Sequence, residues 1–245
     1  MKRLLFGLML FLVSCGSPEL STPAPTQEAI SVLFQPALKP WADKITGCAS
    51  SNPLIGLYFL QSPTLDANIN NNDISLSLGE PVEMNGSLYL SQMGWEQIMV
   101  IINQDNDLSQ LSTSELQTIF SSQTSNLEND AGQPLQVWVL PYGDPVRMLF
   151  DRAVLPSTRL SAEAMLAPDT EAMLEAISSD VGAIGYLPGS ALSSSDPSLV
   201  AEIKVIQLEQ SLQDELRSPV IAITLNEPKG LVRELLICVQ AVVPE

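Results

Sequence analysis

The 245-residue sequence contains no histidine and only three cysteines. The absence of histidine excludes Ser-His-Asp and Cys-His catalysis and every histidine-ligated metal site, so we expect no metal and no cofactor. Basic residues are also scarce, because 11 Lys and Arg stand against 28 Asp and Glu, a net charge of −17. So acidic a chain is not expected to bind nucleic acid, although a local site could still oppose the overall field.

The sequence has one long hydrophobic run, at its N-terminus. Lys2 and Arg3 precede an apolar run from Leu4 to Val13, which is too short to span a bilayer and has the form of a signal peptide. The ending LVSC, at residues 12–15, resembles the lipobox of bacterial lipoproteins, which implies lipid (palmitate) on Cys15. We expect a signal peptide at 1–14, a Pro/Ser/Thr-rich tether at 15–27, and a folded part held outside the cytoplasm on the membrane. An ordinary secretory signal with an incidental cysteine is the alternative.

Cys48 and Cys238 are the two cysteines that remain for the folded part. An oxidising compartment permits a disulfide between them. Each falls near an expected amphipathic helix, and the sequence leaves open whether they are bridged or are two buried thiols. Neither has a base close by in sequence, so thiol catalysis is not expected.

Apolar periodicity predicts strands that alternate with helices. Strands are expected at 29–34, 54–60, 73–78, 87–90, 97–103, 135–140, 181–186, 201–208 and 218–225, and helices near 38–47, 112–120, 144–154, 170–177 and 228–240. Ser112 and Glu115 have the spacing of a capping box at the start of the second of these helices. The alternation predicts an α/β fold with two sheets rich in parallel strands. An apolar content of 45% is enough for one or two cores.

The stretch from Leu135 to Leu155 predicts a buried strand, a sharp turn and a helix. Asp144 is a good N-cap, and Pro145 suits the first helical position, where a missing N–H costs nothing. Turns of this kind aim backbone N–H groups at the helix N-terminus, where α/β proteins often hold anions. This chain has a carboxylate there.

Four segments, in order, resemble the phosphate-type substrate-binding proteins of ABC transporters. The first is the helix LSTSELQTIFSS at 111–122, and the second is the turn at 142–150, in the position of the family's Gly-Ser-Gly-Thr loop with the following Arg and Phe. The third is the intact Gly-Ala-Ile-Gly-Tyr at 182–186, and the fourth is the closing Pro-x-Gly-x-x-Arg-x-x-Leu at 228–236.

The resemblance implies an α/β periplasmic-binding-protein-like fold of two lobes with a ligand cleft between them. One lobe would comprise residues 28–103 plus 213–245 and the other 104–212, with crossovers near 103–106 and 210–216. It also implies a monomer that closes on a small-molecule ligand and hands it to an ABC permease.

The departures from the family pattern argue against phosphate. The Gly-Ser-Gly-Thr positions here read Gly143-Asp144-Pro145-Val146, and the first strand-helix turn reads Phe34-Gln35-Pro36-Ala37, so the expected hydroxyls are absent. A carboxylate in contact with a dianion would repel it by more than about one kcal/mol. The candidate ligand contacts are Gln35, Gly79, Glu80, Tyr142, Gly143, Asp144 and Arg147, which suit a neutral polar or a cationic molecule.

Each candidate contact also has a purely structural interpretation. Asp144 is explained by helix capping alone, Arg147 by an ion pair, Trp95 by packing rather than by a place at the cleft rim, and Tyr186 by packing beneath the cleft. Three functions therefore stay open. They are a lipid-anchored solute-binding protein, a binding-like domain that serves as a sensor or structural lipoprotein without transport, and, with least support, a surface hydrolase that uses paired carboxylates.

Overall fold

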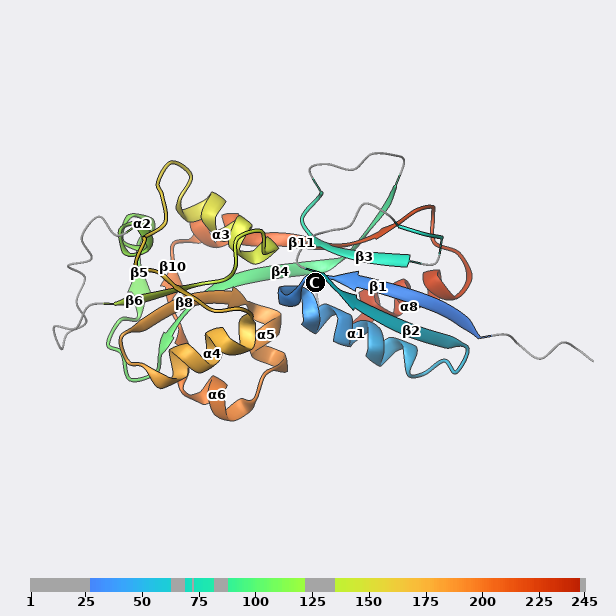
Figure 1. Ribbon diagram of the computed structural model, residues 1–245, viewed down its shortest axis with the longest axis horizontal. Coiled ribbons are helices and arrows are strands. Elements are labelled where there is room, and N and C mark those ends of the chain that lie inside the picture. The colour runs from blue at the N-terminus through green and yellow to red at the C-terminus, as the bar shows by residue number, and fades with distance from the viewer. Residues whose placement is uncertain (1–26, 63–68, 72, 82–87, 122–134, 243–245) are drawn as a thin grey trace, which may run out of the picture.

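The computed structural model describes residues 27–62, 69–71, 73–81, 88–121 and 135–242, and it has two lobes side by side (Figure 1). The expected signal peptide, Cys15 and nearly all of the expected tether lie outside the described residues. Each lobe has its own hydrophobic core, and we name the lobes by these cores. The predicted α/β class and two-lobed fold are confirmed.

Lobe 1 is a five-stranded sheet with two helices packed against it. Its strands run in the order β2-β1-β3-β11-β4, where β1 is parallel to β2 and β3 whereas β11 is antiparallel to β3 and β4. Their bounds are β1 (Glu28–Phe34), β2 (Ile55–Gln61), β3 (Asp73–Leu78), β11 (Arg217–Thr224) and the first half of β4 (Tyr89–Asn103). The 3₁₀ helix η1 (Pro36–Leu38) leads into α1 (Lys39–Ala49), which packs beside α8 (Gly230–Val242).

Lobe 2 is built on the second half of β4 and holds the larger core. Its remaining strands are β5 (Gln110–Leu111), β6 (Gln136–Val139), β7 (Met165–Leu166), β8 (Ala183–Pro188), β9 (Ile203–Val205) and β10 (Gln207–Leu208). Its helices are α2 (Thr113–Ser121), α3 (Pro145–Val154), α4 (Thr170–Ser179), α5 (Gly189–Ser194), α6 (Pro197–Ala201) and α7 (Gln210–Glu215). The capping box is present at α2, where Ser112 N donates to Glu115 Oε2 at 2.8 Å and Glu115 N donates to Ser112 Oγ at 3.3 Å.

Strand β4 joins the lobes, and here the structure corrects the sequence interpretation. We expected separate strands at 87–90 and 97–103, but one 15-residue strand covers both, because β11 pairs with β4 all the way from Tyr89 to Gln97. The two expected sheets are thereby one hydrogen-bonded series of strands. Ile98, Val100, Ile101 and Ile102, from the second half of β4, belong to the core of lobe 2.

The expected strand at 201–208 is also divided. Ile206 N donates to Val100 O in β4, whereas Gln207 N donates to Ser109 O beside β5. The chain therefore changes partner strand after Ile206, and β9 and β10 lie in different sheets. Hydrophobic periodicity records burial but does not record such a change of partner.

Both cores are built from residues between Ile30 and Val239. A chain that starts at Gln27 therefore keeps every core contact of the described residues and is the form used in the experiments below.

Candidate functional site

The turn before α3 forms as the sequence predicts. Gly143 has a φ of 91°, which favours glycine, and Asp144 N donates to Pro141 O at 3.1 Å. Asp144 then caps α3, because its Oδ1 accepts hydrogen bonds from Val146 N at 2.9 Å and from Arg147 N at 3.4 Å. Pro145 has no N–H to offer. The chain's own carboxylate thus lies where this kind of helix N-terminus would hold an anion.

Asp144 is also a buried charge. Only 8% of the residue is exposed, and this burial raises the pKa of its carboxyl to about 6, against the opposing effect of the two backbone hydrogen bonds and of the Arg147 charge. At neutral pH the carboxyl is still mostly ionised. A dianion brought to this position would meet a negative charge in a poorly solvated place, where Coulomb repulsion is only weakly screened.

Gln35 meets this turn from the other lobe. It follows β1, is 5% exposed, and its Nε2 donates to Gly143 O at 3.2 Å. Two residues that are 108 positions apart, both predicted as ligand contacts, are thus hydrogen-bonded to each other. Nearby, Ala37 packs into the core of lobe 2 and Leu78 packs against both cores, so the lobes touch directly here. We call this contact the mouth contact.

Arg147 is held within lobe 2. Its Nη1 donates to Leu140 O at 2.7 Å, and its Nε lies 3.3 Å from Asp151 Oδ2 on the same helix. The side chain is 12% exposed. Beneath it, Tyr186 is fully buried and stacks on Phe150, with ring centroids 3.9 Å apart. Tyr186 therefore packs under the turn, as expected, and burial raises the pKa of its hydroxyl.

The remaining predicted ligand contacts are Gly79, Glu80 and Tyr142. Gly79, with a φ of 78°, ends β3 and donates to Pro219 O at 2.7 Å. Glu80 is exposed, and Tyr142 is 90% exposed. Strand β3 contacts α3, so this part of the chain lies beside the turn, but no described hydrogen bond links Glu80 or Tyr142 to Asp144. Trp95, considered for the cleft rim, is 45% exposed and has Arg217 over its ring.

A buried carboxylate that the sequence analysis did not select lies where β4 passes between the lobes. Glu96 is 3% exposed. Its Oε2 accepts from Trp41 Nε1 of α1 at 2.6 Å and from Ser190 Oγ of α5 at 2.5 Å, and its Oε1 accepts from Ser190 N at 3.0 Å. We call this cluster the floor contact. Its signal in the sequence was that Glu96 is the sole charged residue between Tyr89 and Asn103.

The surroundings of Glu96 are closely packed. A Cβ on Gly189, next to Ser190, would come within 2.8 Å of Met99 Cε and 3.3 Å of Gln97 O, so glycine permits α5 to approach β4. Lys44 lies over the Trp41 ring, 4.0 Å from its centroid. Burial lowers the pKa of Lys44, and the charge of Glu96 acts in the opposite direction.

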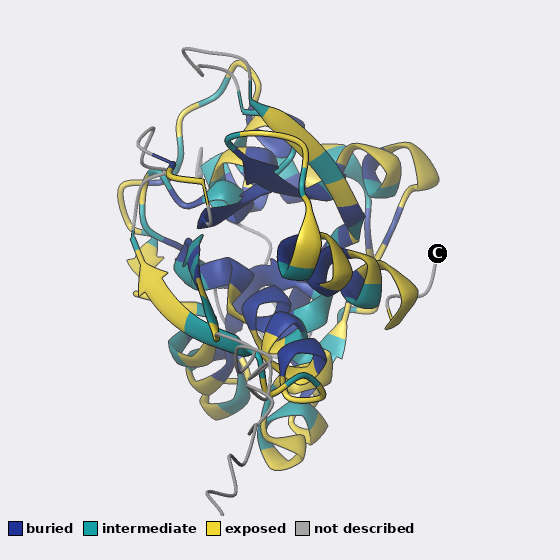
Figure 2. Cartoon of the chain, turned by 90° about the vertical axis from the view of Figure 1, so that its right-hand side faces the viewer, coloured by how far each residue is buried: buried dark blue, intermediate teal, exposed yellow. Residues whose placement is uncertain are grey.

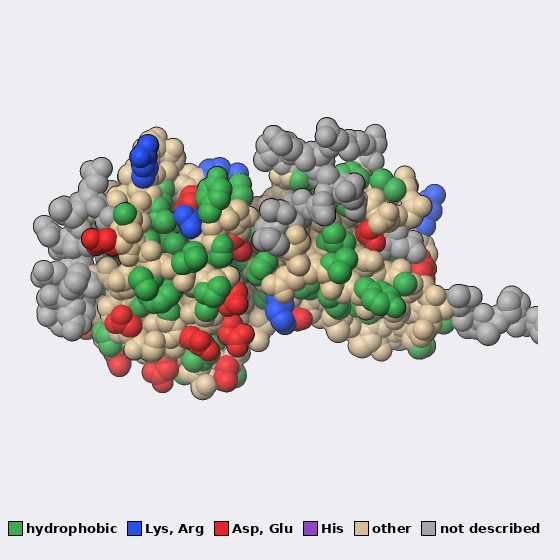
Figure 3. Space-filling model, viewed as in Figure 1, with side chains coloured by type: hydrophobic (Ala, Val, Ile, Leu, Met, Phe, Trp, Pro, Cys, Tyr) green, Lys and Arg blue, Asp and Glu red, His purple; other side chains and the backbone are tan. Residues whose placement is uncertain are grey.

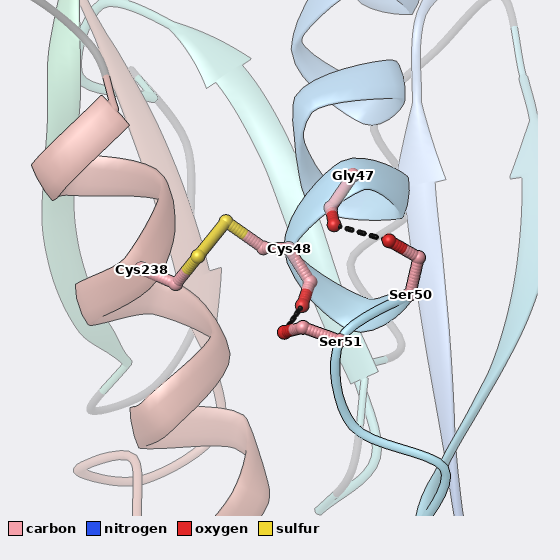
Figure 4. Close-up of a disulfide and its surroundings, with 5 residues drawn as sticks. All are labelled: Gly47, Cys48, Ser50, Ser51 and Cys238. Atoms are coloured by element: carbon pink, nitrogen blue, oxygen red, sulfur yellow. Dashed lines mark hydrogen bonds between the residues drawn. A yellow bond between two sulfur atoms is a disulfide. The ribbon is translucent and has the colours of Figure 1, made fainter.

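The two cysteines of the folded part are joined. Cys48 of α1 and Cys238 of α8 form a disulfide across 190 residues of sequence, so of the two alternatives the structure has the bridged one (Figure 4). The bond links two helices of lobe 1 and does not cross between the lobes.

A pocket of about 600 Å³ lies at the N-terminal end of α8 in lobe 1. Glu28, Asn71, Thr224, Asn226 and Lys229 are among its lining residues, and none of the seven predicted ligand contacts is. Within the described ranges no group of three or more His, Cys, Asp or Glu residues is placed to hold a metal ion. In the same ranges no helix is both long and apolar enough to cross a membrane.

No protein-family model matches the chain, and no curated protein sequence is significantly similar to it. Solved structures do match. One is described as a phosphate ABC transporter substrate-binding protein with bound phosphate from Clostridium perfringens, with a TM-score of 0.68 and 14% identity over 86% of this chain and 93% of that one. The fold is that of the phosphate-type substrate-binding proteins. An ABC-type phosphate transport receptor from Vibrio cholerae is also similar, with a TM-score of 0.60 and 13% identity over 87% and 94% of the two chains.

The same fold occurs in regulatory domains. That of CcmR from Synechocystis PCC6803, in complex with 2-PG, has a TM-score of 0.61 and 14% identity over 88% of this chain and 97% of that one. At such identities the likeness concerns the fold alone. Function must therefore be argued from the residues of the site.

Proposed function

We propose that this protein is a lipid-anchored, extracytoplasmic solute-binding protein that binds a small neutral or cationic polar molecule rather than phosphate. Lipid on Cys15, followed by the tether to residue 27, would hold the domain at the outer face of the bacterial cell membrane. The LVSC sequence and its charged and apolar flanks support this anchor. An ABC permease would be the partner that receives the ligand.

One observation carries the choice of ligand, namely the buried Asp144 at the N-terminus of α3. Its Oδ1 already accepts from Val146 N and Arg147 N, and Pro145 supplies no N–H, so the backbone donors of this first turn are used. An incoming anion would have to displace a carboxylate of like charge. An ammonium or hydroxyl donor would instead find acceptors there, in the Asp144 carboxylate and Gly143 O.

A thermal-shift screen of the chain from Gln27 on tests this proposal. The screen compares phosphate and other oxyanions with sugars, neutral amino acids and polyamines. A ligand present at a hundredfold its dissociation constant adds about 2.7 kcal/mol to the free energy of unfolding, which is easily detected. We expect stabilisation by a neutral or cationic compound that is weakened in Asp144→Ala; stabilisation by phosphate would overturn the proposal.

A second candidate is a binding-like domain without a role in transport, and the lobe contacts favour it. Gln35 hydrogen-bonds directly to the turn that would read a ligand, and Glu96 accepts hydrogen bonds from both lobes. A domain held closed by its own side chains would present a constant surface, as a sensor or structural lipoprotein would. If no compound of the screen stabilises the chain, this candidate replaces the first.

A further inference from the structure

Strand β2 is an edge of the nine-stranded sheet. It pairs in parallel with β1, from Glu28–Ile55 to Phe34–Gln61, and no other described strand pairs with its second edge. Figure 2 shows this strand exposed over much of its length. A seven-residue edge whose outward N–H and C=O groups pair with no other described strand is a template on which another strand can add.

Strand β2 lacks the features that usually protect an edge strand. Tyr58, Phe59 and Leu60 are 63%, 39% and 53% exposed, so consecutive apolar side chains reach solvent on both faces. The strand contains no proline and no charge, and it lies in the longest uncharged stretch of the sequence, Ile45 to Leu65. Charges, prolines or bulges normally keep such edges from pairing, and their absence here indicates that the edge is covered in use.

We propose that β2 pairs with β2 of a second copy of this chain, antiparallel and with two-fold symmetry, so that the sheets of the two copies become continuous. The sequence IGLYFLQ is compatible with its own reverse. Centred on Tyr58, the pairing sets Tyr58 against Tyr58, Leu57 against Phe59, and Gly56 against Leu60. Aromatic and aliphatic cross-strand pairs stabilise a sheet, and every pair occurs twice except Tyr58 with Tyr58, which lies on the two-fold axis.

The charge distribution favours this contact over others between two acidic copies. Residues 98–216, which lie mostly in lobe 2, carry 17 of the 28 acidic residues and only 4 of the 11 basic ones. On the face seen in Figure 3, Asp and Glu side chains gather over lobe 2. A β2 to β2 contact joins the uncharged edges of lobe 1 and leaves the acidic lobes at the far ends. The proposed dimer differs from the monomer that we expected from the resemblance, and the experiments below decide between the two.

The proposed interface is small, so we expect a weak dimer with a dissociation constant on the order of micromolar or higher. Repulsion between two acidic chains opposes it, and salt screens that repulsion. Sedimentation equilibrium of the chain from Gln27 on should therefore show a monomer–dimer equilibrium that shifts toward dimer as salt rises. A monomer at all concentrations up to about 0.5 mM would overturn the proposal.

Single cysteines test the register. In the chain from Gln27 on, Cys48 and Cys238 are bonded to each other, so an introduced thiol has no partner within its own chain. With oxidised glutathione as electron acceptor, two copies of Tyr58→Cys should form a disulfide between chains, because residue 58 faces itself. Leu60→Cys is the matched control, because it faces Gly56 and should cross-link at least tenfold more slowly. Equal rates for the two variants would contradict the register.

Charge at the symmetry axis tests the surface. Tyr58→Asp brings two carboxylates together and should weaken dimerisation at least tenfold. Tyr89→Asp, at a tyrosine of β4 that is 42% exposed, should leave it unchanged. Circular dichroism melting checks that both variants fold. A dimer that survives Tyr58→Asp would overturn the proposal. A wild-type chain that stays monomeric and binds phosphatidylglycerol vesicles would also overturn it if Tyr58→Asp abolishes that binding, because a membrane would then cover the edge.

Discussion

The mouth contact and the floor contact, which both join the lobes, differ in kind. At the mouth contact, the neutral Gln35 amide donates a hydrogen bond of 3.2 Å to Gly143 O. At the floor contact, a buried carboxylate accepts three hydrogen bonds of 2.5 to 3.0 Å from two helices. A neutral hydrogen bond contributes about 1 kcal/mol net, whereas hydrogen bonds to charged groups contribute more and leave a costly group when broken. Any opening of the cleft should therefore break the mouth contact first and rotate about the floor contact.

The largest effect should follow loss of the floor contact. Glu96→Ala leaves the buried Trp41 Nε1–H and the two half-buried Ser190 donors without their acceptor, and we expect a loss of about 3–5 kcal/mol in the free energy of unfolding. Urea denaturation measures it. Glu80→Ala, at an exposed carboxylate near the mouth, is the matched control and should change stability by less than about 0.5 kcal/mol. A loss of stability in Glu96→Ala as small as that of the control would contradict the claim that the floor contact is stronger than the mouth contact.

The Cys48–Cys238 disulfide lies within lobe 1, so its removal gives a free energy with which the contacts between the lobes can be compared. Because Cys48 and Cys238 close a long loop, Cys48→Ser with Cys238→Ser should lower the free energy of unfolding by about 2–4 kcal/mol. Hydrogen exchange followed by mass spectrometry should then show faster exchange in α1 and α8, with little change in α3 and α4 of lobe 2. Uniformly faster exchange in both lobes would mean that the floor contact couples them into one unit.

The mouth should respond to pH through Asp144. Its pKa is raised to about 6 in the folded chain and is ordinary in the unfolded one, so the folded state binds more protons between these values. Its contribution to stability therefore increases as pH falls from 7.5 to 4.5. Relative to Asp144→Asn, the wild type should gain about 1–3 kcal/mol over that range, while at pH 7.5 the two should agree within about 1 kcal/mol.

The measurement is urea denaturation of both proteins at each pH, because the carboxylates that they share cancel in the difference. A flat difference would show that the carboxyl has an ordinary pKa. A large loss of ligand affinity in Asp144→Asn without a change in melting temperature would support the proposed ligand contact, whereas unchanged affinity would show that Asp144 is only a cap.

The smallest effect is expected at Gln35. Gln35→Ala removes the amide that donates to Gly143 O and should lower the free energy of unfolding by about 1 kcal/mol. Amide exchange should accelerate at residues 143–147 but not at residues 189–191, which the floor contact holds. Acceleration at both places would indicate that the two contacts open together.

Local signals in the sequence predicted most of the elements correctly. Asp144 before Pro145 predicted the start of α3, and Ser112 with Glu115 predicted the start of α2, because capping depends on neighbouring residues alone. The strand at 73–78 and the helix at 170–177 were likewise found from their periodicity. The seven candidate ligand contacts remain predictions, of which the structure brings Gln35 and Gly143 together.

The predictions that were wrong concern features that depend on pairing between segments far apart in the sequence. Strand β4 is continuous because it pairs with β11, which comes more than a hundred residues later in the chain. The expected strand at 201–208 is divided after Ile206 because the chain changes its partner strand there. Glu96 was overlooked because its donors, Trp41 and Ser190, come from helices on either side of it in sequence. A single charge inside a long apolar strand is the local sign of such a cluster, since a buried charge requires partners.

Calorimetric titration of the chain from Gln27 on with inorganic phosphate at pH 7.5 is the most direct test of the central claim, which is that the Asp144 carboxylate occupies the anion position of the cleft. The account predicts no saturable heat up to about 10 mM phosphate. Saturable one-to-one binding with a dissociation constant in the micromolar range would contradict it.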